Sequence, residues 1–433
     1  MEKEIHKSQI SLLELAKKYL QNCQKRGVNI KVSPLCDFVI WTECLGNEKV
    51  KLLQQKKFLS LNFFYALIKE FFSIGKNSQY FIRGSILNNK KKIKVIYSYC
   101  SKESFSKKGF FYDKYFNYSS NKNKDIYWFL ISSDNYIPKK LDNIIIVYRD
   151  NSSYNSLYIL KYFIKSFFKK NFIHNFNNTL NFSNIYANLF YKVFKNHKFD
   201  LYLPFENRPH QNLVIEVTKK ISKKNKVYGY YHRMPEPLQS EMFYKNSILD
   251  RLYVCSKIQK NVFCKIFNWP SNKIKIINSI RYPVLAKRKN FIFLSFNIKK
   301  NNLFIQNLKI YLEKSKSSIN NFKISIHPLK KNNKVHIDLS KKIKNDFINT
   351  KSNKKNLNLP IILGEPGSIA SEMLETNKCV AHISDNYLNI FSGKIWNNIK
   401  VQNIYKNIFI YKKKTQQTLI KRNGRKDNFS KIL

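Results

Sequence analysis

The alternation of short strands and helices from residue 198 onward is the feature that most constrains the fold of this chain. Apolar runs of strand length at 199–204, 226–231 and 251–255 alternate with segments of helical apolar spacing at 210–221 and 257–267. Repeated alternation of this kind predicts parallel sheets with helices on both faces. Ligands bind such sheets at the carboxyl ends of the strands, so polar residues that follow a strand are the first candidates for a site.

The length of the chain favours two domains. With 433 residues, of which 43% are hydrophobic, it can bury two cores. We expect an N-terminal extension of unassigned role at 1–120, packed on or part of the first lobe. Two sheet domains are expected at 121–240 and 245–400, followed by a basic, helical tail at 401–433.

The segment 154–172 has helical spacing but mixes aromatic and basic residues along its whole length. Aromatic stripes at helical spacing usually face a protein interior, so we expect core packing, with a membrane surface as the alternative. Further helices are expected at 10–19 and 58–72, and strands at 124–132 and 141–148.

A turn between two buried strands near the C-terminus is a candidate phosphate site. The runs 360–363 and 379–383 flank a helix expected from Ser368 to residue 377. Gly364 and Gly367 allow the backbone to approach a ligand, and Ser368 as the N-cap leaves free N–H groups for an anion. Glu372, one turn later, can accept hydrogen bonds from sugar hydroxyls. A plain helix cap is the structural alternative.

Polar residues also follow three other predicted strands. His327 and Pro328 end the strand at 323–327. Glu206 to His210 and Gly229 to Glu236 end two neighbouring strands in the preceding half of the chain. We therefore expect these groups to face one another across a cleft.

The formal charge of +52 does not by itself indicate a nucleic-acid-binding protein. The lysines are spread over the whole length, among polar loops, and form no continuous stripe. We expect mainly a solvated surface, with some attraction to anionic lipid or phosphorylated substrates, and no nucleic-acid partner. No signal-peptide pattern or spanning segment is evident, so we expect a cytoplasmic protein, peripheral at the inner face of the cell membrane.

The seven cysteines include no Cys-x-x-Cys pair, which argues against a disulfide framework and a structural zinc site.

The order of these strand-end motifs resembles bacterial surface-carbohydrate biosynthesis glycosyltransferases of the GT-B type, which make capsule or lipopolysaccharide. The similarity covers about residues 198–395 and consists of the motifs Glu206-Asn207-Arg208-Pro209-His210, Gly229-Tyr230-Tyr231-His232, Tyr253-Val254-Cys255-Ser256 and Asn278-Ser279-Ile280-Arg281-Tyr282. It departs from the family pattern at Asn278, where a glycine is expected. The C-terminal half is also similar to sialyl- and Kdo-type transferases.

This resemblance implies two Rossmann-like, doubly wound domains that face a central cleft. The first domain would bind the acceptor, and the second would bind a nucleotide-activated sugar as co-substrate. Residues near the nucleotide would be Ser256, His327 and Pro328, whereas Gly367, Ser368 and Glu372 would lie near the phosphate and sugar.

The chemistry of sugar transfer needs a base for the acceptor hydroxyl and positive charge or N–H dipoles for the departing phosphate. Glu206, His232 and Glu236 are the base candidates, although Glu206 can instead form a local ion pair with Arg208. Arg281 or a lysine, with the helix start at Ser368, can serve the phosphate. No Asp-x-Asp occurs in the sequence, so we expect inverting transfer without a metal or another cofactor.

Two alternatives remain open at this point. A phosphotransferase that moves glycerol phosphate from a cytidine nucleotide would use the same cleft and a similar base. A basic protein that binds nucleic acid or a membrane without catalysis is the alternative outside enzymes. Motifs of dinucleotide sites, nucleoside triphosphatases, serine hydrolases and zinc proteases are absent from the sequence.

Overall fold

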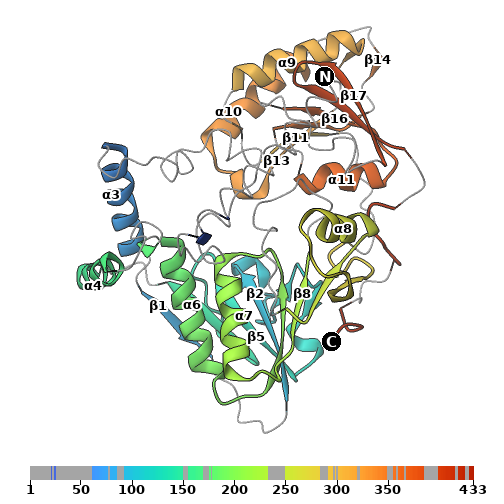
Figure 1. The fold of residues 1–433 in the computed structure, drawn as a ribbon. Coiled ribbons are helices and arrows are strands. Elements are labelled where there is room, and N and C mark those ends of the chain that lie inside the picture. Colours follow the sequence, from blue (N-terminus) through green and yellow to red (C-terminus); the bar gives the residue numbers. More distant parts are fainter. Residues whose placement is uncertain are drawn as a thin grey trace.

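The protein folds into two lobes, each built around a largely parallel sheet (Figure 1). The computed structural model describes residues 61–76, 79–84, 92–149, 155–168, 175–176, 178–232, 249–282, 291–295, 298, 301–318, 322–348, 355–356, 359–364, 367–384, 398–414, 418–424 and 429–433, together with 21, 24 and 25. Among these residues, no helix is both long and apolar enough to cross a bilayer.

The first lobe contains an eight-stranded sheet in the order β1-β6-β5-β2-β7-β8-β9-β10. All neighbouring strands are parallel except the edge pair β1 and β6. The strands are β1 (Tyr80–Arg83), β2 (Ile93–Cys100), β5 (Ile126–Ser132), β6 (Ile144–Arg149), β7 (Phe199–Pro204), β8 (Val227–Tyr230), β9 (Arg251–Val254) and β10 (Ile274–Ile276).

The second lobe contains a six-stranded sheet in the order β13-β11-β15-β16-β18-β17. Its first four strands are parallel, and the hairpin β17–β18 pairs antiparallel with β16. The strands are β11 (Phe291–Leu294), β13 (Lys323–Ile326), β15 (Ile361–Leu363), β16 (Val380–Ile383), β17 (Ile399–Tyr405) and β18 (Ile408–Lys413). Two short pairs complete the strands: β3 (Tyr112–Asp113) with β4 (Tyr118–Ser119), and β12 (Ser317–Ser318) with β14 (Lys355–Asn356).

The described helices cover the sheets unequally in the two lobes. They are α3 (Leu61–Lys76), α4 (Ser156–Phe167), α6 (Asn178–Phe194), α7 (Pro209–Ile221), α8 (Lys257–Asn261), α9 (Asn301–Lys314), α10 (Lys334–Ile343) and α11 (Gly367–Glu375). In the second lobe, α9 and α10 pack on one face of the sheet and α11 packs on the other. In the first lobe, α6 and α7 cover one face, where Phe129 of β5 meets Phe190 and Phe194 of α6.

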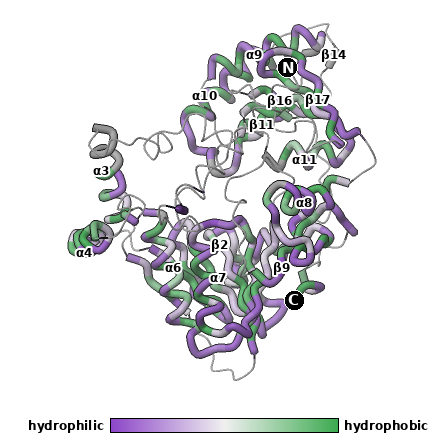
Figure 2. The backbone as a smooth tube through the Cα atoms, in the orientation of Figure 1, coloured by the Kyte–Doolittle hydropathy of each residue, from purple (hydrophilic) through white to green (hydrophobic). Residues whose placement is uncertain are grey.

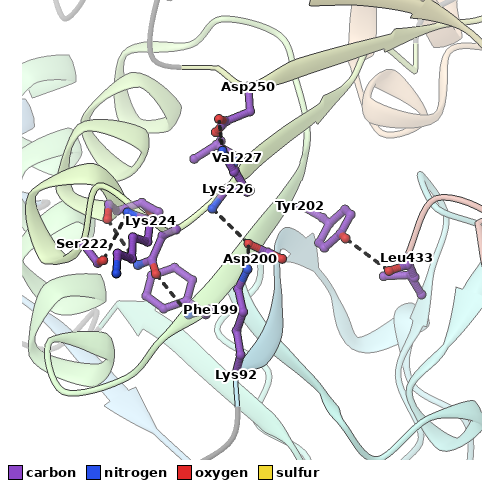
Figure 3. Close-up of polar contacts among 12 residues, drawn as sticks. Lys92, Phe199, Asp200, Tyr202, Ser222, Lys224, Lys226, Val227, Asp250 and Leu433 are labelled. Carbon is purple, nitrogen blue, oxygen red and sulfur yellow. Dashed lines mark hydrogen bonds and ion pairs between the residues drawn. The ribbon is translucent and has the colours of Figure 1, made fainter.

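The opposite face of the first sheet is covered by the β3–β4 hairpin and by the end of the chain. Trp128, next to Phe129 on β5, points to this face and packs against Phe111. Phe429 stacks on Phe116 with ring centroids 4.4 Å apart. The Tyr202 hydroxyl donates to the backbone carbonyl of Leu433 at 3.4 Å (Figure 3). The last residues of the chain therefore return from the second lobe to the first.

Acidic residues stabilise the amino end of the first sheet. The carboxylate of Asp200 lies 2.7 Å from the Lys92 ammonium and accepts from the backbone N–H of Lys226 (Figure 3). Asp250 likewise accepts from the N–H of Val227 and from the Lys219 ammonium. Asp200 and Asp250 therefore stabilise the beginning of β8, at the amino end of the sheet, whereas ligands are expected at the carboxyl end.

Most expected elements are confirmed, and the α/β class with two Rossmann-like lobes is confirmed with them. The strand at 199–204 has the expected bounds, and the expected helix at 58–72 is α3. The helix expected at 10–19 lies outside the described residues. The expectation of a helical tail is wrong, because residues 399–413 form the hairpin β17–β18 that closes the second sheet.

The sheet topology differs from the domain boundaries expected at 120 and 240–245. Strand β2, expected within the extension, lies at the centre of the first sheet, where it pairs with β5 and β7. Strands β9 and β10 continue the first sheet beyond β8. The first sheet therefore spans residues 80–276, and the second spans 291–413.

Candidate functional site

A cavity of about 330 Å³ opens at the carboxyl ends of the adjacent parallel strands β2 and β7. This is the edge at which ligands bind open α/β sheets, and the volume falls within the range of small-molecule sites. Aromatic side chains and one charged pair make up its wall: Tyr99, Tyr115, Phe182, Glu206, Arg208, Pro209 and His210.

The charged centre of the cavity wall is Glu206. One of its carboxylate oxygens lies 3.2 Å from Nε2 of His232, and the other lies 3.3 Å from Nε of Arg208. The β7–β8 register explains the first contact, because Pro204 pairs with Tyr230 and each functional residue lies two positions further on. Glu206 is 17% exposed and lines the cavity, whereas His232 is 3% exposed and lies behind it. Of these two base candidates, Glu206 is thus the one that lines the cavity, and its expected ion pair with Arg208 is present as well.

Gln211 holds the loop that carries Glu206. Its side-chain oxygen accepts from the N–H groups of Glu206 and Arg208, at 2.9 and 3.2 Å. Its side-chain nitrogen donates to the carbonyl of Pro204 at 2.7 Å. Asn207 completes the turn in the left-handed region, with φ of 57°. The carboxylate position is therefore fixed by the first turn of α7. The sequence could have predicted this role, because a glutamine three residues after a helix N-cap is typical of a capping box.

His210 is a neutral part of the wall. Burial, together with the nearby Arg208 cation, lowers its pKa to about 3. Its two ring nitrogens lie 2.9 Å from the Tyr97 hydroxyl and 3.3 Å from the Tyr99 hydroxyl. A neutral imidazole has one donor and one acceptor nitrogen, so one tyrosine donates to it and the other accepts. His210 lies in the first turn of α7, which begins at Pro209.

Tyr115 links His232 to Arg281. Its ring meets the His232 ring edge to face, with centroids 4.6 Å apart, and the Arg281 guanidinium lies 5.3 Å from the Tyr115 ring centroid. Arg281 also lies 5.1 Å from the ring centroid of Tyr282. Arg281 was expected to belong to the donor domain. In the structure Arg281 follows β10, at the edge of the first sheet. Its contact with Tyr115, which packs on His232, connects it to Glu206 in the cavity wall.

Asp113 holds the loop that carries Tyr115 by hydrogen bonds to its backbone. Its carboxylate accepts from the N–H groups of Tyr115 and Phe116, at 2.7 and 3.0 Å. Burial raises the pKa of Asp113 to about 6, although the hydrogen bonds from these amides and the Arg281 charge oppose the shift. The sequence offered no spacing signal for Asp113 or Tyr115, because both act through a short hairpin inside a region without recognisable motifs.

The second lobe brings the strand-end residues His327 and Gly364 to one edge. The N–H of His327 donates to Leu294, the last residue of β11, and the N–H of Ser295 donates to the last residue of β15. His327 and Gly364 thus follow strands on either side of β11. Pro328 begins a short 3-10 turn directly after His327. The imidazole is half-buried, and its pKa is lowered by burial and by the nearby His336 and Lys330.

The Gly364 turn depends on a buried histidine for which the sequence suggested no role. Gly364 has φ of +89°, and its carbonyl accepts from Nε2 of His382 at 2.6 Å. The other ring nitrogen of His382 lies 2.7 Å from the Tyr411 hydroxyl. Because a carbonyl can only accept, Nε2 carries the proton, and the tyrosine donates to Nδ1. Burial lowers the pKa of His382 to about 4, which keeps this tautomer neutral.

The structure places Ser368, Ser256 and Glu372, three residues expected at the donor site, inside a helix turn, at a helix cap and near an arginine, respectively. Helix α11 begins at Gly367, so Ser368 lies inside its first turn and does not precede it. Ser256 is buried and caps α8, its hydroxyl accepting from the N–H of Gln259 at 3.0 Å. Glu372 is buried on α11, where its charge, with that of Glu375, acts on Arg422 and opposes the lowering of the arginine pKa by burial. Glu236, the third base candidate, lies outside the described residues.

A group of three or more His, Cys, Asp or Glu side chains that could hold a metal ion does not occur within the described residues.

The chain has distant likenesses among solved structures. No protein-family model matches it, and no curated protein matches it in sequence. The wall teichoic acid polymerase TagF, soaked with CDPG, is 11% identical with a TM-score of 0.33, over 67% of this chain and 69% of that one. An α,α-trehalose 6-phosphate synthase from Burkholderia multivorans is 7% identical with a TM-score of 0.33, over 59% and 68% of the two chains. A UDP-forming α,α-trehalose-phosphate synthase from Burkholderia vietnamiensis is 9% identical with a TM-score of 0.33, over 65% and 81%. Likenesses at this level assign neither a function nor residue roles to this chain.

Proposed function

We propose that this protein is a glycosyltransferase that moves a sugar from a nucleotide-activated donor to a surface-glycan precursor, with inversion and without a metal. The observation that carries the proposal is Glu206 in the wall of an aromatic cavity at the carboxyl edge of a parallel sheet. One carboxylate oxygen lies against His232, and the other lies against Arg208. Aromatic walls with a few convergent polar groups are typical of small-molecule sites.

In this proposal, Glu206 is the general base and the acceptor hydroxyl enters the cavity beside it. The carboxylate takes the hydroxyl proton while the hydroxyl oxygen attacks the anomeric carbon of the donor. The bond from that carbon to the nucleotide phosphate breaks, and the phosphate leaves with the electron pair. A single displacement of this kind inverts the anomeric centre. His232 donates from Nε2 to the carboxylate and keeps it oriented, as a positioning residue.

The donor would bind at the carboxyl edge of the second sheet. His327 and Gly364 follow strands on either side of β11, and α11 begins at Gly367 directly after the Gly364 turn. Helix N–H groups in this first turn, which includes Ser368, would stabilise the negative charge of the phosphate. Arg281, at the edge of the first sheet, is the cation that we assign to the leaving phosphate.

Substitution of Glu206 by glutamine tests the base. We expect Glu206→Gln to lower kcat by about 10²–10⁴-fold, the usual contribution of a general base, with little change in the melting temperature. Glu103→Gln, at an exposed acid in a 3-10 turn that does not line the cavity, is the matched control and should retain activity. Turnover of Glu206→Gln at the wild-type rate would remove Glu206 from this role.

A nucleotide panel tests the donor side. Selective thermal stabilisation by one of CMP, CDP, UDP, GDP or TDP, lost in His327→Ala and Ser368→Ala, is expected. The same base could serve glycerol-phosphate transfer from a cytidine nucleotide, and product analysis separates the two reactions. Sugar on the acceptor supports our proposal, whereas glycerol phosphate with release of CMP supports the alternative. Salt-dependent DNA binding without any nucleotide binding would favour a non-catalytic protein.

A further inference from the structure

Helices α3 and α4 form a small helical pair at the edge of the first lobe (Figure 1). Their inner faces pack on each other and on Phe176. The Phe71 and Phe163 rings lie 6.5 Å apart, and the Phe163 and Phe176 rings lie 5.3 Å apart. Ile159 and Ile74 are fully buried in the same cluster. The inner faces therefore have the core role expected from the sequence.

The outer faces of the same helices are also apolar, and they are exposed. On α4 and its C-cap Phe168, Leu157 is 76% exposed, Phe167 61% and Phe168 82%, with Leu160 and Ile164 at helical spacing between them. Ile68 and Phe72, one turn apart on the neighbouring helix α3, are exposed as well. Figure 2 shows hydrophobic residues on α4 at the edge of the molecule. Several large apolar side chains on one face of a helix are normally buried, so their exposure on the outer face of α4 indicates a binding surface.

Within the described residues of α3 and α4, the exposed charged side chains are lysines. Lys161 and Lys165 lie within the exposed face of α4, three or four residues from its large apolar side chains, and α4 contains no acidic residue. On α3, Lys69 is exposed beside Ile68 and Phe72. The acid of α3, Glu70, accepts from the backbone N–H of Asn178 at 2.7 Å and is thus engaged with the start of α6.

We propose that the outer faces of α3 and α4 dock on the surface of an anionic lipid bilayer. Amphipathic helices with large apolar residues and lysines bind bilayers in this way, with the apolar side chains below the headgroups. The lysine ammonium groups can reach the anionic headgroups on their flexible stems. A second copy of the chain would instead bury the same lysines against each other without an acid to pair with them.

Docking at this face would place the bilayer beside the cavity. The Tyr158 hydroxyl on α4 donates to the side-chain oxygen of Asn181 on α6 at 2.5 Å, and the next residue, Phe182, lines the cavity. A hydroxyl acceptor carried by a lipid could therefore reach Glu206 without leaving the membrane surface. This step rests on the proposed function, whereas the docking itself does not.

Vesicle flotation of the full chain tests the docking. We expect binding to vesicles of equal parts phosphatidylcholine and phosphatidylglycerol, and at least tenfold weaker partitioning of Phe167→Asp/Phe168→Asp. Burial of one phenylalanine side chain is worth at least about a tenfold change in a binding constant. Lys161→Gln and Lys165→Gln should each weaken binding about fivefold, and addition of salt should do the same. Val335→Asp, at an exposed apolar residue of α10 in the second lobe, is the control that should bind as the wild type does.

Three results would overturn the docking proposal. The proposal fails if the wild-type chain binds no vesicles. It also fails if Phe167→Asp/Phe168→Asp binds as tightly as wild type while both proteins remain folded by circular dichroism. Concentration-dependent dimerisation in sedimentation that this variant abolishes would assign the face to a second copy. Loss of sugar transfer in Glu206→Gln with unchanged flotation would leave the docking supported, so the two proposals fail independently.

Discussion

The buried imidazole of His382 should make the stability of the protein depend on pH. The ring lies between the Gly364 carbonyl and the Tyr411 hydroxyl, and burial lowers its pKa from 6.5 to about 4. In the unfolded chain the same ring takes up a proton near pH 6.5. Below that pH the unfolded state binds more protons than the folded state, so the free energy of unfolding falls as the pH falls from about 6.5 towards 4.

The size of this effect follows from the two pKa values. A shift of one unit corresponds to about 1.4 kcal/mol, so His382 should cost about 2 kcal/mol of stability near pH 5 and about 3 kcal/mol near pH 4, relative to pH 7. His210, with its pKa lowered to about 3, acts in the same direction. Substitution of His382 by glutamine removes only the His382 share of the loss.

Urea unfolding of the wild type and His382→Gln at several pH values between about 7 and 4 measures this share. We expect the loss of unfolding free energy with falling pH to be smaller in the variant by about 2–3 kcal/mol. Tyr411→Phe is the control, because it removes one hydrogen bond, worth about 1 kcal/mol at every pH, but leaves the imidazole buried. An equal pH dependence in His382→Gln and wild type would refute the reasoning.

Two further predictions concern the buried carboxyl group of Asp113 and two glycines with positive φ. Burial raises the pKa of Asp113 from 3.8 to about 6, so its charging costs stability as the pH rises through this range. Asp113→Asn, which keeps an oxygen for the amides of Tyr115 and Phe116, should therefore raise the unfolding free energy at pH 7 by up to about 3 kcal/mol and lose this gain near pH 4; a less stable variant at pH 7 in urea unfolding would contradict the assignment. A Cβ on Gly84, at φ of +102°, would lie 2.1 Å from the carbonyl oxygen of Ile144, whereas a Cβ on Gly424, at φ of +71°, would meet nothing within 4 Å. Gly84→Ala should thus destabilise the protein by more than the roughly 1–2 kcal/mol of positive φ alone, and Gly424→Ala by no more than that; equal melting temperatures would contradict the clash.

Local patterns determined much of the secondary structure and one side of the site. The expected bounds of the strand at 199–204 match β7, since an apolar run followed by a proline, a helix and a second run leaves few other structures. The meeting of Glu206 and His232 also followed from the sequence. Both lie just beyond the ends of strands that were expected to be neighbours, and parallel neighbours end at one edge.

Long-range pairing decided the rest of the fold and of the site. Nothing local indicated that β2 would lie beside β7, or that β9 and β10 would extend the first sheet. Tyr99 and Gln211, whose side chains meet at 3.3 Å, are 112 residues apart in the chain. Asp113 and Tyr115 became part of the site only because their hairpin packs over the first sheet, beside the carboxyl ends of its strands.

Helix α4 shows the same division within a single element. Its spacing and composition determined a helix, and the structure describes one at Ser156–Phe167. The sequence could not tell which face is covered, because large apolar residues lie on both faces and the lysines of the outer face are interspersed among them. Only the packing of α3 and Phe176 on one face decided that the other, with its phenylalanines and lysines, would be exposed. The sequence determines what each segment can bury, whereas the tertiary structure decides which of its surfaces find a partner, since that depends on residues far away in the chain.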